Sequence, residues 1–329
     1  MTGKKSAKKK AASATAAGTK SNGRAGGTRL AGKKAGLAET SVNTAPVSAD
    51  QSAAPQEASK TGKVGKLFRI GKNLKLKDGN AAAKPLSSGD KAADKLEVER
   101  ISARIGELQD IFYAEHQRKI LIVLQGMDTS GKDGTIKGVF GNIDPLGIIS
   151  VAFKAPSTTE KAHDFLWRIH GQVPAAGEIV IFNRSQYEDV VITRVHDWID
   201  EAECRRRYDH IRAFERMLAE TGTVVLKFFL HISKDEQKRR LQERIDDPQK
   251  HWKFDAADLE ERKFWDGYQR LYADALLATD AGHAPWYVIP ADSKTHRNLA
   301  IASIVLETLE QMNLAYPPGN PDLAKLQIS

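Results

Sequence analysis

The sequence predicts an α/β fold in which a five-stranded parallel sheet lies between two layers of helices. Five apolar runs of strand length recur between residues 119 and 290, and segments with helical periodicity separate them. Continuous apolar runs suit strands that are covered on both faces, and alternation of strands with helices is typical of parallel sheets. Ligands of such sheets bind beyond the carboxyl ends of the strands, so we expect the functional site there.

The elements can be placed in order along the chain. Ile101, Ile105 and Leu108 recur at helical spacing, which predicts one long amphipathic helix before the first strand. Ser157 with Glu160, and Ser233 with Glu236, have the spacing of a capping box and begin two later helices. The expected strands are 119–125, 148–153, 178–182, 223–231 and 286–289. The expected helices are 91–118, from about 132, 157–170, 201–221, 233–247, from Asp255 or Asp258 to 279, and 295–312.

The net charge of +8 is concentrated at the N-terminus. Residues 1–62 hold 11 Lys and Arg against 3 Asp and Glu, whereas the remaining residues hold 39 of each sign. The first 62 residues lack aromatic side chains and nearly all Leu, Ile and Val, so they cannot offset their ordering entropy and are predicted to be disordered. This tail is interpreted as a solvated segment without a specific partner, as a basic arm that contacts polyanions nonspecifically, or as a transit peptide.

Composition also limits the domain organisation and the classes of protein. We divide the chain into the tail 1–62, an extended wrapping segment 63–90, a domain 91–318 and a C-terminal tail 319–329. Cys204 is the only cysteine, which excludes an internal disulfide. The sequence contains no run of about 18 apolar residues, so no membrane-spanning helix is predicted. We therefore expect a cytoplasmic protein without membrane association.

The first strand runs into a glycine-rich motif that is typical of phosphate binding. Gly126 to Lys132 match G-x-x-x-x-G-K between a strand and a helix. The glycines let backbone N–H groups converge on one phosphate, the helix N-terminus adds positive charge, and Lys132 reaches the terminal oxygens. Asp133 stands where Ser or Thr usually binds magnesium, and the further loop carboxylate, Asp128, suits the same ion. The expected phosphate-binding residues of the loop are Gly126, Met127, Asp128, Thr129, Ser130, Gly131, Lys132, Asp133 and Gly134. The alternative is a glycine-rich turn with an exposed lysine.

A second motif follows the third strand, where neighbouring strands of P-loop enzymes usually end in a magnesium-binding Asp. Here that position is Asn183, and Glu188 and Asp189 just beyond it can supply the missing negative charge. The alternative for Arg184 and Glu188 is a salt bridge on a surface turn.

Two arginine-rich stretches follow this motif. The first contains Arg194, Arg206 and Arg207, and the second lies in a lid at about 234–260 that contains Arg240 and Arg244 on one helix face. The planar fork of arginine grips two phosphate oxygens at once. For any single basic residue here, ordinary surface pairing is the alternative.

Four motifs, in order, make the chain resemble the polyphosphate kinase 2 family over residues 65–316. They are Gln125–Gly134, Phe182–Asp189, Pro248–Phe254 and Ala284–Asp292. The resemblance implies a P-loop kinase-like fold with a helical lid, Mg²⁺ with Mn²⁺ as a substitute, inorganic polyphosphate in a basic channel, and a homo-oligomer, either a dimer or a tetramer. It implies that the catalytic residues are Asp128, Lys132, Arg184, Glu188 and Arg244, that Asp128 and Glu188 hold the metal, and that Lys250, Trp252 and Lys253 bind phosphate in the lid.

The residues Asn183 and Glu188 depart from the pattern of many family members and resemble the subgroup that accepts nucleoside monophosphates and diphosphates. The expected function is therefore magnesium-dependent phosphoryl transfer between polyphosphate and AMP or ADP, with guanine nucleotides as further acceptors. Two alternatives stay open. One is a nucleoside monophosphate kinase that uses ATP, and the other is a nucleic-acid-binding protein that acts through the basic tail.

Overall fold

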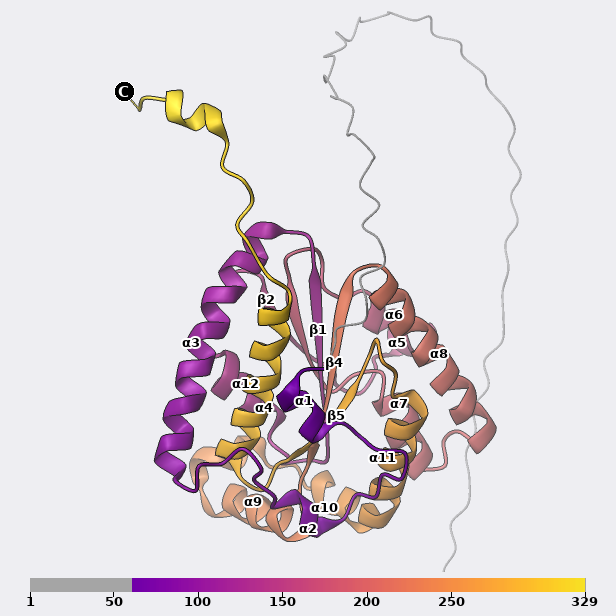
Figure 1. Ribbon diagram of the computed structural model, residues 1–329. Helices are drawn as coiled ribbons and strands as arrows, with labels where there is room; N and C mark the ends of the chain where they lie inside the picture. The colour runs from indigo at the N-terminus through magenta and orange to yellow at the C-terminus, as the bar shows by residue number, and fades with distance from the viewer. Residues whose placement is uncertain (1–60, 329) are drawn as a thin grey trace, which may run out of the picture. The chain divides into compact units, whose positions relative to one another are not determined.

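The computed structural model describes residues 61–328, all within one unit that spans Ser52–Ser329 (Figure 1). The predicted disordered tail falls outside the described residues, apart from its last two positions.

The centre of the fold is a five-stranded sheet in which every strand is parallel to its neighbours, as the sequence predicted. The strands are β1 (Lys119–Gln125), β2 (Ile148–Ala152), β3 (Ile179–Asn183), β4 (Thr223–His231) and β5 (Trp286–Pro290), in the spatial order β2-β3-β1-β4-β5. Leu124 pairs with Asn183 on one side and with Phe228 on the other. The carboxyl ends of β1 and β3 therefore lie side by side, which places the two predicted motifs next to each other.

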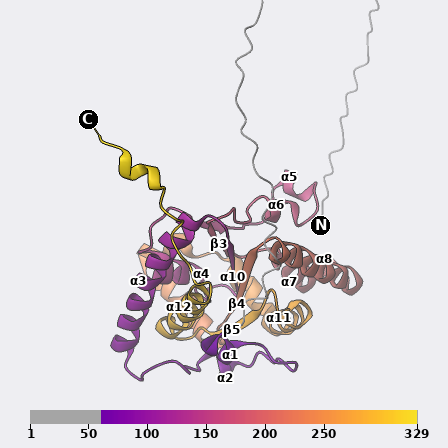
Figure 2. The same cartoon turned by 45° about the horizontal axis from the view of Figure 1, so that its top comes forward.

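Helices cover both faces of this sheet (Figures 1 and 2). One face packs against α3 (Lys91–Glu115) and α12 (Lys294–Gln311), and the other against α7 (Glu188–Val195), α8 (Glu201–Glu220) and α11 (Trp265–Thr279). Strand β1 serves both cores, because Ile122 belongs to the first cluster and Val123 to the second. The alternation follows from the period of two in a strand, and it confirms the predicted three-layer fold.

Several elements differ from those expected. The helix after the loop, α4 (Lys132–Thr135), is one turn long and continues as a π-helix over Ile136–Phe140. The helix expected over 157–170 is two short helices, α5 (Thr158–Lys161), which has the predicted capping box, and α6 (Trp167–His170). Helix α7 was not predicted, because its run of valine, isoleucine and threonine residues has the composition of a strand.

The lid is also more divided than the sequence indicated. It consists of α9 (Lys234–Asp246), a 3₁₀ segment (Pro248–Lys253) with proline at its start, α10 (Ala257–Glu261) and a second 3₁₀ segment (Arg262–Phe264). The single helix expected from Asp255 or Asp258 to Thr279 is thus three elements, of which α11 is the last.

The segment 63–90 contains two short helices, α1 (Lys63–Phe68) and α2 (Asp78–Ala81), rather than extended chain throughout. Phe68 is buried in the first core, and Arg69 pairs with Asp280 at 2.9 Å. The C-terminal segment 319–328 contains one 3₁₀ turn, Pro321–Lys325, and its residues 319–323 and 325–328 are exposed. Within residues 61–328, no helix has the length and apolarity that crossing a membrane requires.

Candidate active site

The glycine-rich loop joins β1 to α4 and depends on two glycines. Gly126 has φ +148° and Gly131 has φ +103°, values that side-chain-bearing residues rarely adopt. A Cβ at Gly126 would lie 2.7 Å from the carbonyl oxygen of Leu230, and one at Gly131 would lie 1.9 Å from Nη1 of Arg297. Only glycine therefore allows the loop to curl against β4 and α12.

Lys132 begins α4 and is buried beneath the loop. Its Nζ donates to the carbonyl oxygen of Gly126 at 2.8 Å and to that of Met127 at 3.4 Å. Burial lowers the pKa of Lys132, and the nearby Arg184 guanidinium lowers it further. An anion beside Nζ would offset both effects, since an opposite charge favours the charged form.

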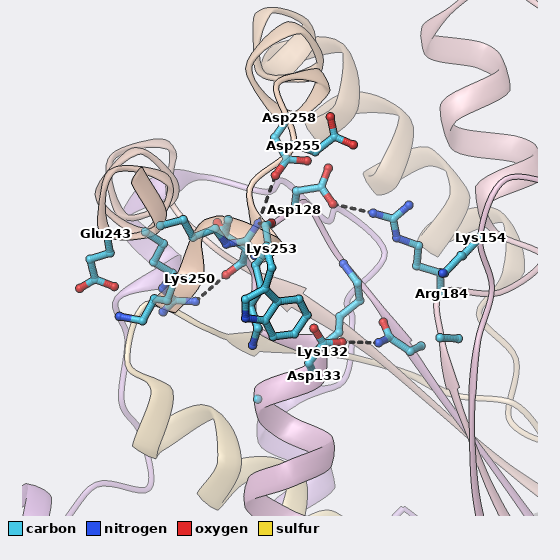
Figure 3. A pocket seen from close by; sticks show the side chains of 18 of the residues that line it. Asp128, Lys132, Asp133, Lys154, Arg184, Glu243, Lys250, Lys253, Asp255 and Asp258 are labelled. Carbon is cyan, nitrogen blue, oxygen red and sulfur yellow. Dashed lines mark hydrogen bonds and ion pairs between the residues drawn. The ribbon is translucent and has the colours of Figure 1, made fainter. Parts of the chain in front are cut away.

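The loop forms the floor of a cavity of about 630 Å³ (Figure 3). Its walls come from the ends of β2 and β3, the lid and the start of α12. Of the predicted site residues, those that line it are Asp128, Thr129, Gly131, Lys132, Asp133, Gly134, Asn183, Arg184, Arg240, Arg244, Lys250, Trp252 and Lys253. The structure thus brings the first, second and third sequence motifs together around one hollow.

Asn183 and Asp133 occupy the positions where a P-loop enzyme usually has Asp and Ser or Thr. In this chain Nδ2 of Asn183 donates to Oδ1 of Asp133 at 2.5 Å. The two departures from the usual pattern therefore compensate each other, because an amide can donate to the loop carboxylate whereas a second carboxylate would repel it.

Arg184 connects two carboxylates at the mouth of the loop. Its Nη2 lies 2.6 Å from Oδ1 of Asp128 and its Nη1 lies 3.9 Å from Oε2 of Glu188 (Figure 3 shows the first contact). The Arg184 backbone has φ +66°, an uncommon value for a residue other than glycine. Burial raises the pKa of Glu188, and Arg184 and Lys132 oppose that shift. The salt bridge that the alternative expected is present, but it lies at the cavity rather than on a plain surface turn, because Arg184 lines the cavity.

Other predicted residues lie away from the cavity lining. Gly126, Met127 and Ser130 are buried in the loop. Asp189 faces Arg168, with 3.4 Å between their charged atoms, and burial raises the pKa of Asp189.

Arg194, Arg206 and Arg207 do not line the cavity. Arg194 donates to the carbonyl oxygen of Ile199, and Arg206 and Arg207 both pair with Glu203. These three arginines therefore contact groups in and around α7 and α8 outside this cavity, and their role in phosphate binding stays a prediction.

Several charged lining residues were not identified from the sequence, among them Lys154, Asp258, Lys294 and Arg297. Lys154 follows β2, Asp258 lies in α10, and Lys294 and Arg297 begin α12. Burial and the negative charge of Asp128 raise the pKa of Asp258 to about 6, although Arg244 lies 3.2 Å away. Lys154 directly follows a predicted strand and was identifiable on that ground. Asp258 and Arg297 come to the cavity only through the tertiary fold.

The carboxylates fit a magnesium ion that is shared with a substrate. In the described part of the chain, no three His, Cys, Asp or Glu side chains are grouped to hold a metal ion by themselves. Mg²⁺ is usually bound by one or two carboxylates together with substrate phosphates, rather than by an all-protein cage. Asp128 and Glu188 both pair with Arg184, and the negative charge of Asp128 raises the pKa of Asp258. These hard oxygen donors suit such an arrangement.

Comparisons with known proteins agree with this geometry. A family model described as polyphosphate kinase 2 (PPK2) matches residues 88–317. The AMP/ADP-polyphosphate phosphotransferase of Meiothermus ruber is 51% identical over 228 residues, which cover 69% of this chain and 85% of that protein. The ADP-polyphosphate phosphotransferase of Rhodopseudomonas palustris is 41% identical over 273 residues, which cover 78% and 93%. The crystal structure of polyphosphate kinase 2 from Arthrobacter aurescens superposes with a TM-score of 0.77 at 44% identity, covering 83% of this chain and 97% of the other.

Proposed function

The chain belongs to the polyphosphate kinase 2 family, and on that premise we propose that it transfers phosphoryl groups between inorganic polyphosphate and both AMP and ADP. The observation that carries the proposal is the cavity at the phosphate loop, whose lining includes Lys132, Arg184 and Arg244. Direct transfer between two phosphates requires positioning and charge neutralisation rather than a protein nucleophile.

Each group in the cavity has a role in such a transfer. The loop N–H groups and Lys132 bind oxygens of the phosphate that enters the loop. Arg184 and Arg244 are placed to stabilise charge on the phosphoryl group in transit, since guanidinium forks suit non-bridging oxygens. The lid residues Lys250 and Lys253 contact further phosphates of the chain. A nucleotide phosphate is already ionised at neutral pH, so no general base is needed to activate it.

Magnesium belongs to the proposal at the carboxylate end of the cavity. Asp128, which lines the cavity, and Glu188, which lies outside the lining but pairs with Arg184, would hold the ion, and Asp258 would assist through a bound water. When bound, Mg²⁺ neutralises phosphate charge and so lowers the barrier to transfer. Arg184 keeps the two carboxylates oriented toward one another through its two ion pairs.

The acceptor preference is supported by similarity. The Meiothermus relative, whose name includes both AMP and ADP, is more similar to this chain than the Rhodopseudomonas relative, whose name includes ADP alone. The comparisons support neither an ATP-dependent monophosphate kinase nor a nucleic-acid-binding protein. Guanine nucleotides as acceptors, the homo-oligomer and the cytoplasmic location stay predictions.

The test is polyphosphate-dependent ATP formation with AMP and ADP as separate acceptors. Wild type should use both, and Lys132→Ala should lose at least about 100-fold in kcat because it removes a preorganised cation from the reacting phosphates. Lys137→Ala is the matched control, since Lys137 is exposed one turn farther along the same helix. Activity with ATP and AMP but none with polyphosphate would refute the proposed function.

A further inference from the structure

Three consecutive carbonyl oxygens of the phosphate loop accept hydrogen bonds from buried side chains of other elements. Nε2 of Gln237 donates to the carbonyl oxygen of Asp128 at 3.2 Å. Nη1 of Arg240 donates to the carbonyl oxygens of Thr129, at 2.9 Å, and of Ser130, at 3.2 Å. Gln237 and Arg240 are three residues apart on α9 and so share one helix face. The start of the lid therefore holds the outer side of the loop.

Arg240 uses all five of its N–H groups in contacts within the protein. Besides the two loop carbonyls, its Nη2 donates to the carbonyl oxygens of Ala291, at 2.7 Å, and Asp292, at 2.9 Å. Its Nε donates to Glu236 at 2.7 Å, and the side chain is 5% exposed. A guanidinium has five donors, so none remains for a phosphate. The predicted phosphate contact of Arg240, which lines the cavity, therefore has no free donor in this geometry.

We propose that Arg240, together with Gln237, is a positioning residue that fixes the peptide orientation of the phosphate loop. This inference rests on the proposed function, which places a phosphate in the loop. A trans peptide directs its C=O and its N–H to opposite sides. Holding the carbonyl oxygens of Asp128 and Ser130 outward therefore turns the N–H groups of Thr129 and Gly131 inward, and both of these residues line the cavity.

The contacts around α9 make this orientation rigid. Nη1 of Arg262 donates to Oε1 of Gln237 at 2.7 Å, which leaves the amide nitrogen to face the loop. Ser233, the N-cap of α9, donates through its hydroxyl to Asp292 at 2.8 Å. The first two turns of α9 are thus joined to the loop and to the segment after β5. Arg244, one turn farther, instead contacts the lid residues Lys253 and Asp258.

The substitution Arg240→Lys distinguishes the proposed positioning role from a direct phosphate contact. Arg240→Lys keeps the positive charge, which would preserve much of a direct phosphate contact. A lysine has three donors on one atom and cannot span the carbonyls of two separate segments. We expect Arg240→Lys to lose at least about 100-fold in kcat/KM, as preorganised donors are lost. Arg239→Lys, the same change at an exposed, ion-paired neighbour, should leave kcat/KM unchanged.

Gln237→Met tests the same inference without altering charge. It preserves volume but removes one hydrogen bond to the loop, so kcat/KM should fall about threefold to tenfold. Amide hydrogen exchange across residues 126–132 should accelerate in both variants and not in Arg239→Lys. Thermal unfolding of each variant shows whether it folds, and Gln237→Met carries the test if Arg240→Lys does not.

Salt dependence separates a positioning role from a direct phosphate contact when the charge is removed. The logarithm of polyphosphate affinity should fall with the logarithm of salt concentration at the wild-type slope in Arg240→Met and in Gln237→Met. Arg244→Ala should lower that slope by about one contact. The inference is overturned if Arg240→Lys retains wild-type kcat/KM, or if loop exchange is unchanged in a folded Gln237→Met. Failure of the proposed function would instead appear as wild type that binds no polyphosphate.

Discussion

The carboxylate of Asp258 offers a quantitative test of the site's electrostatics. Its side chain is 15% exposed, lies 3.2 Å from Arg244, and has a pKa raised from 3.8 to about 6 by burial and by Asp128. A carboxyl group with a raised pKa holds its proton more tightly in the folded than in the unfolded protein. Its contribution to stability is therefore present at low pH and is lost as the pH rises from about 4 through 6.

The substitution Asp258→Asn removes this dependence because the amide does not titrate. For a pKa of about 6 in the folded and 3.8 in the unfolded state, wild type should lose about 1 kcal/mol of unfolding free energy between pH 5 and pH 8 relative to the variant. In a domain of this size that corresponds to a Tm difference of about 2–4 °C. The variant should also be less active, since it loses a carboxylate of the proposed metal site.

The assay is thermal unfolding at pH 5 and pH 8, without magnesium, of wild type, Asp258→Asn and Asp255→Asn. Asp255 is the matched control because it lines the same cavity with an exposed side chain. The Tm of Asp258→Asn relative to wild type should rise from pH 5 to pH 8, and by more than that of Asp255→Asn. An equal change in the two variants, or a change of the opposite sign, would show that burial beside Asp128 does not control this carboxyl.

Three further predictions concern other parts of the chain. Lys227→Met should lower the unfolding free energy by about 3–5 kcal/mol, measured by urea unfolding, because it leaves the buried Glu215 without its partner at 2.6 Å; adding Glu215→Leu should recover most of the loss. Glu188→Gln should raise the Mg²⁺ concentration for half-maximal activity by at least about tenfold, while a Tm close to wild type would show that the fold is intact. Deleting residues 1–60 should leave kcat/KM for ADP unchanged, and a large decrease would assign the tail a role in catalysis.

The fold could be predicted because its determinants are local and periodic. A strand such as β1, apolar at every position but its ends, can only be covered on both faces, and this fixes the class of sheet. The errors have local causes too. In α7 the run Val190 to Thr193 has the composition of a strand, and only packing against α11 and α8 makes it helical. In the lid, a sequence rich in charge gave no apolar periodicity by which to divide it.

The parts of the candidate site that are formed by contiguous residues could be predicted from the sequence. The loop from Gly126 to Lys132 carries its geometry in its glycines, which the structure shows to be sterically required at Gly126 and Gly131. A sequence cannot show which acceptors surround an arginine. Arg206 and Arg240 look alike in the sequence, yet Arg206 pairs with Glu203 on the surface of α8, whereas all donors of Arg240 bind backbone carbonyls and Glu236 at the outer side of the loop.

The distribution of charge in the cavity explains how a neutral domain can bind a polyanion. Residues 63–329 hold equal numbers of basic and acidic side chains, but nine basic and five acidic side chains line the cavity. Three of the acids, Asp128, Asp255 and Asp258, lie together (Figure 3) and act on one another electrostatically. The proposed magnesium ion would offset the repulsion between these acids and the substrate phosphates at that end. Lys250 and Lys253 also line the cavity, and although Lys250 pairs with Asp247 at 2.9 Å, the polyphosphate chain should extend toward these two lysines while its reacting end meets the metal.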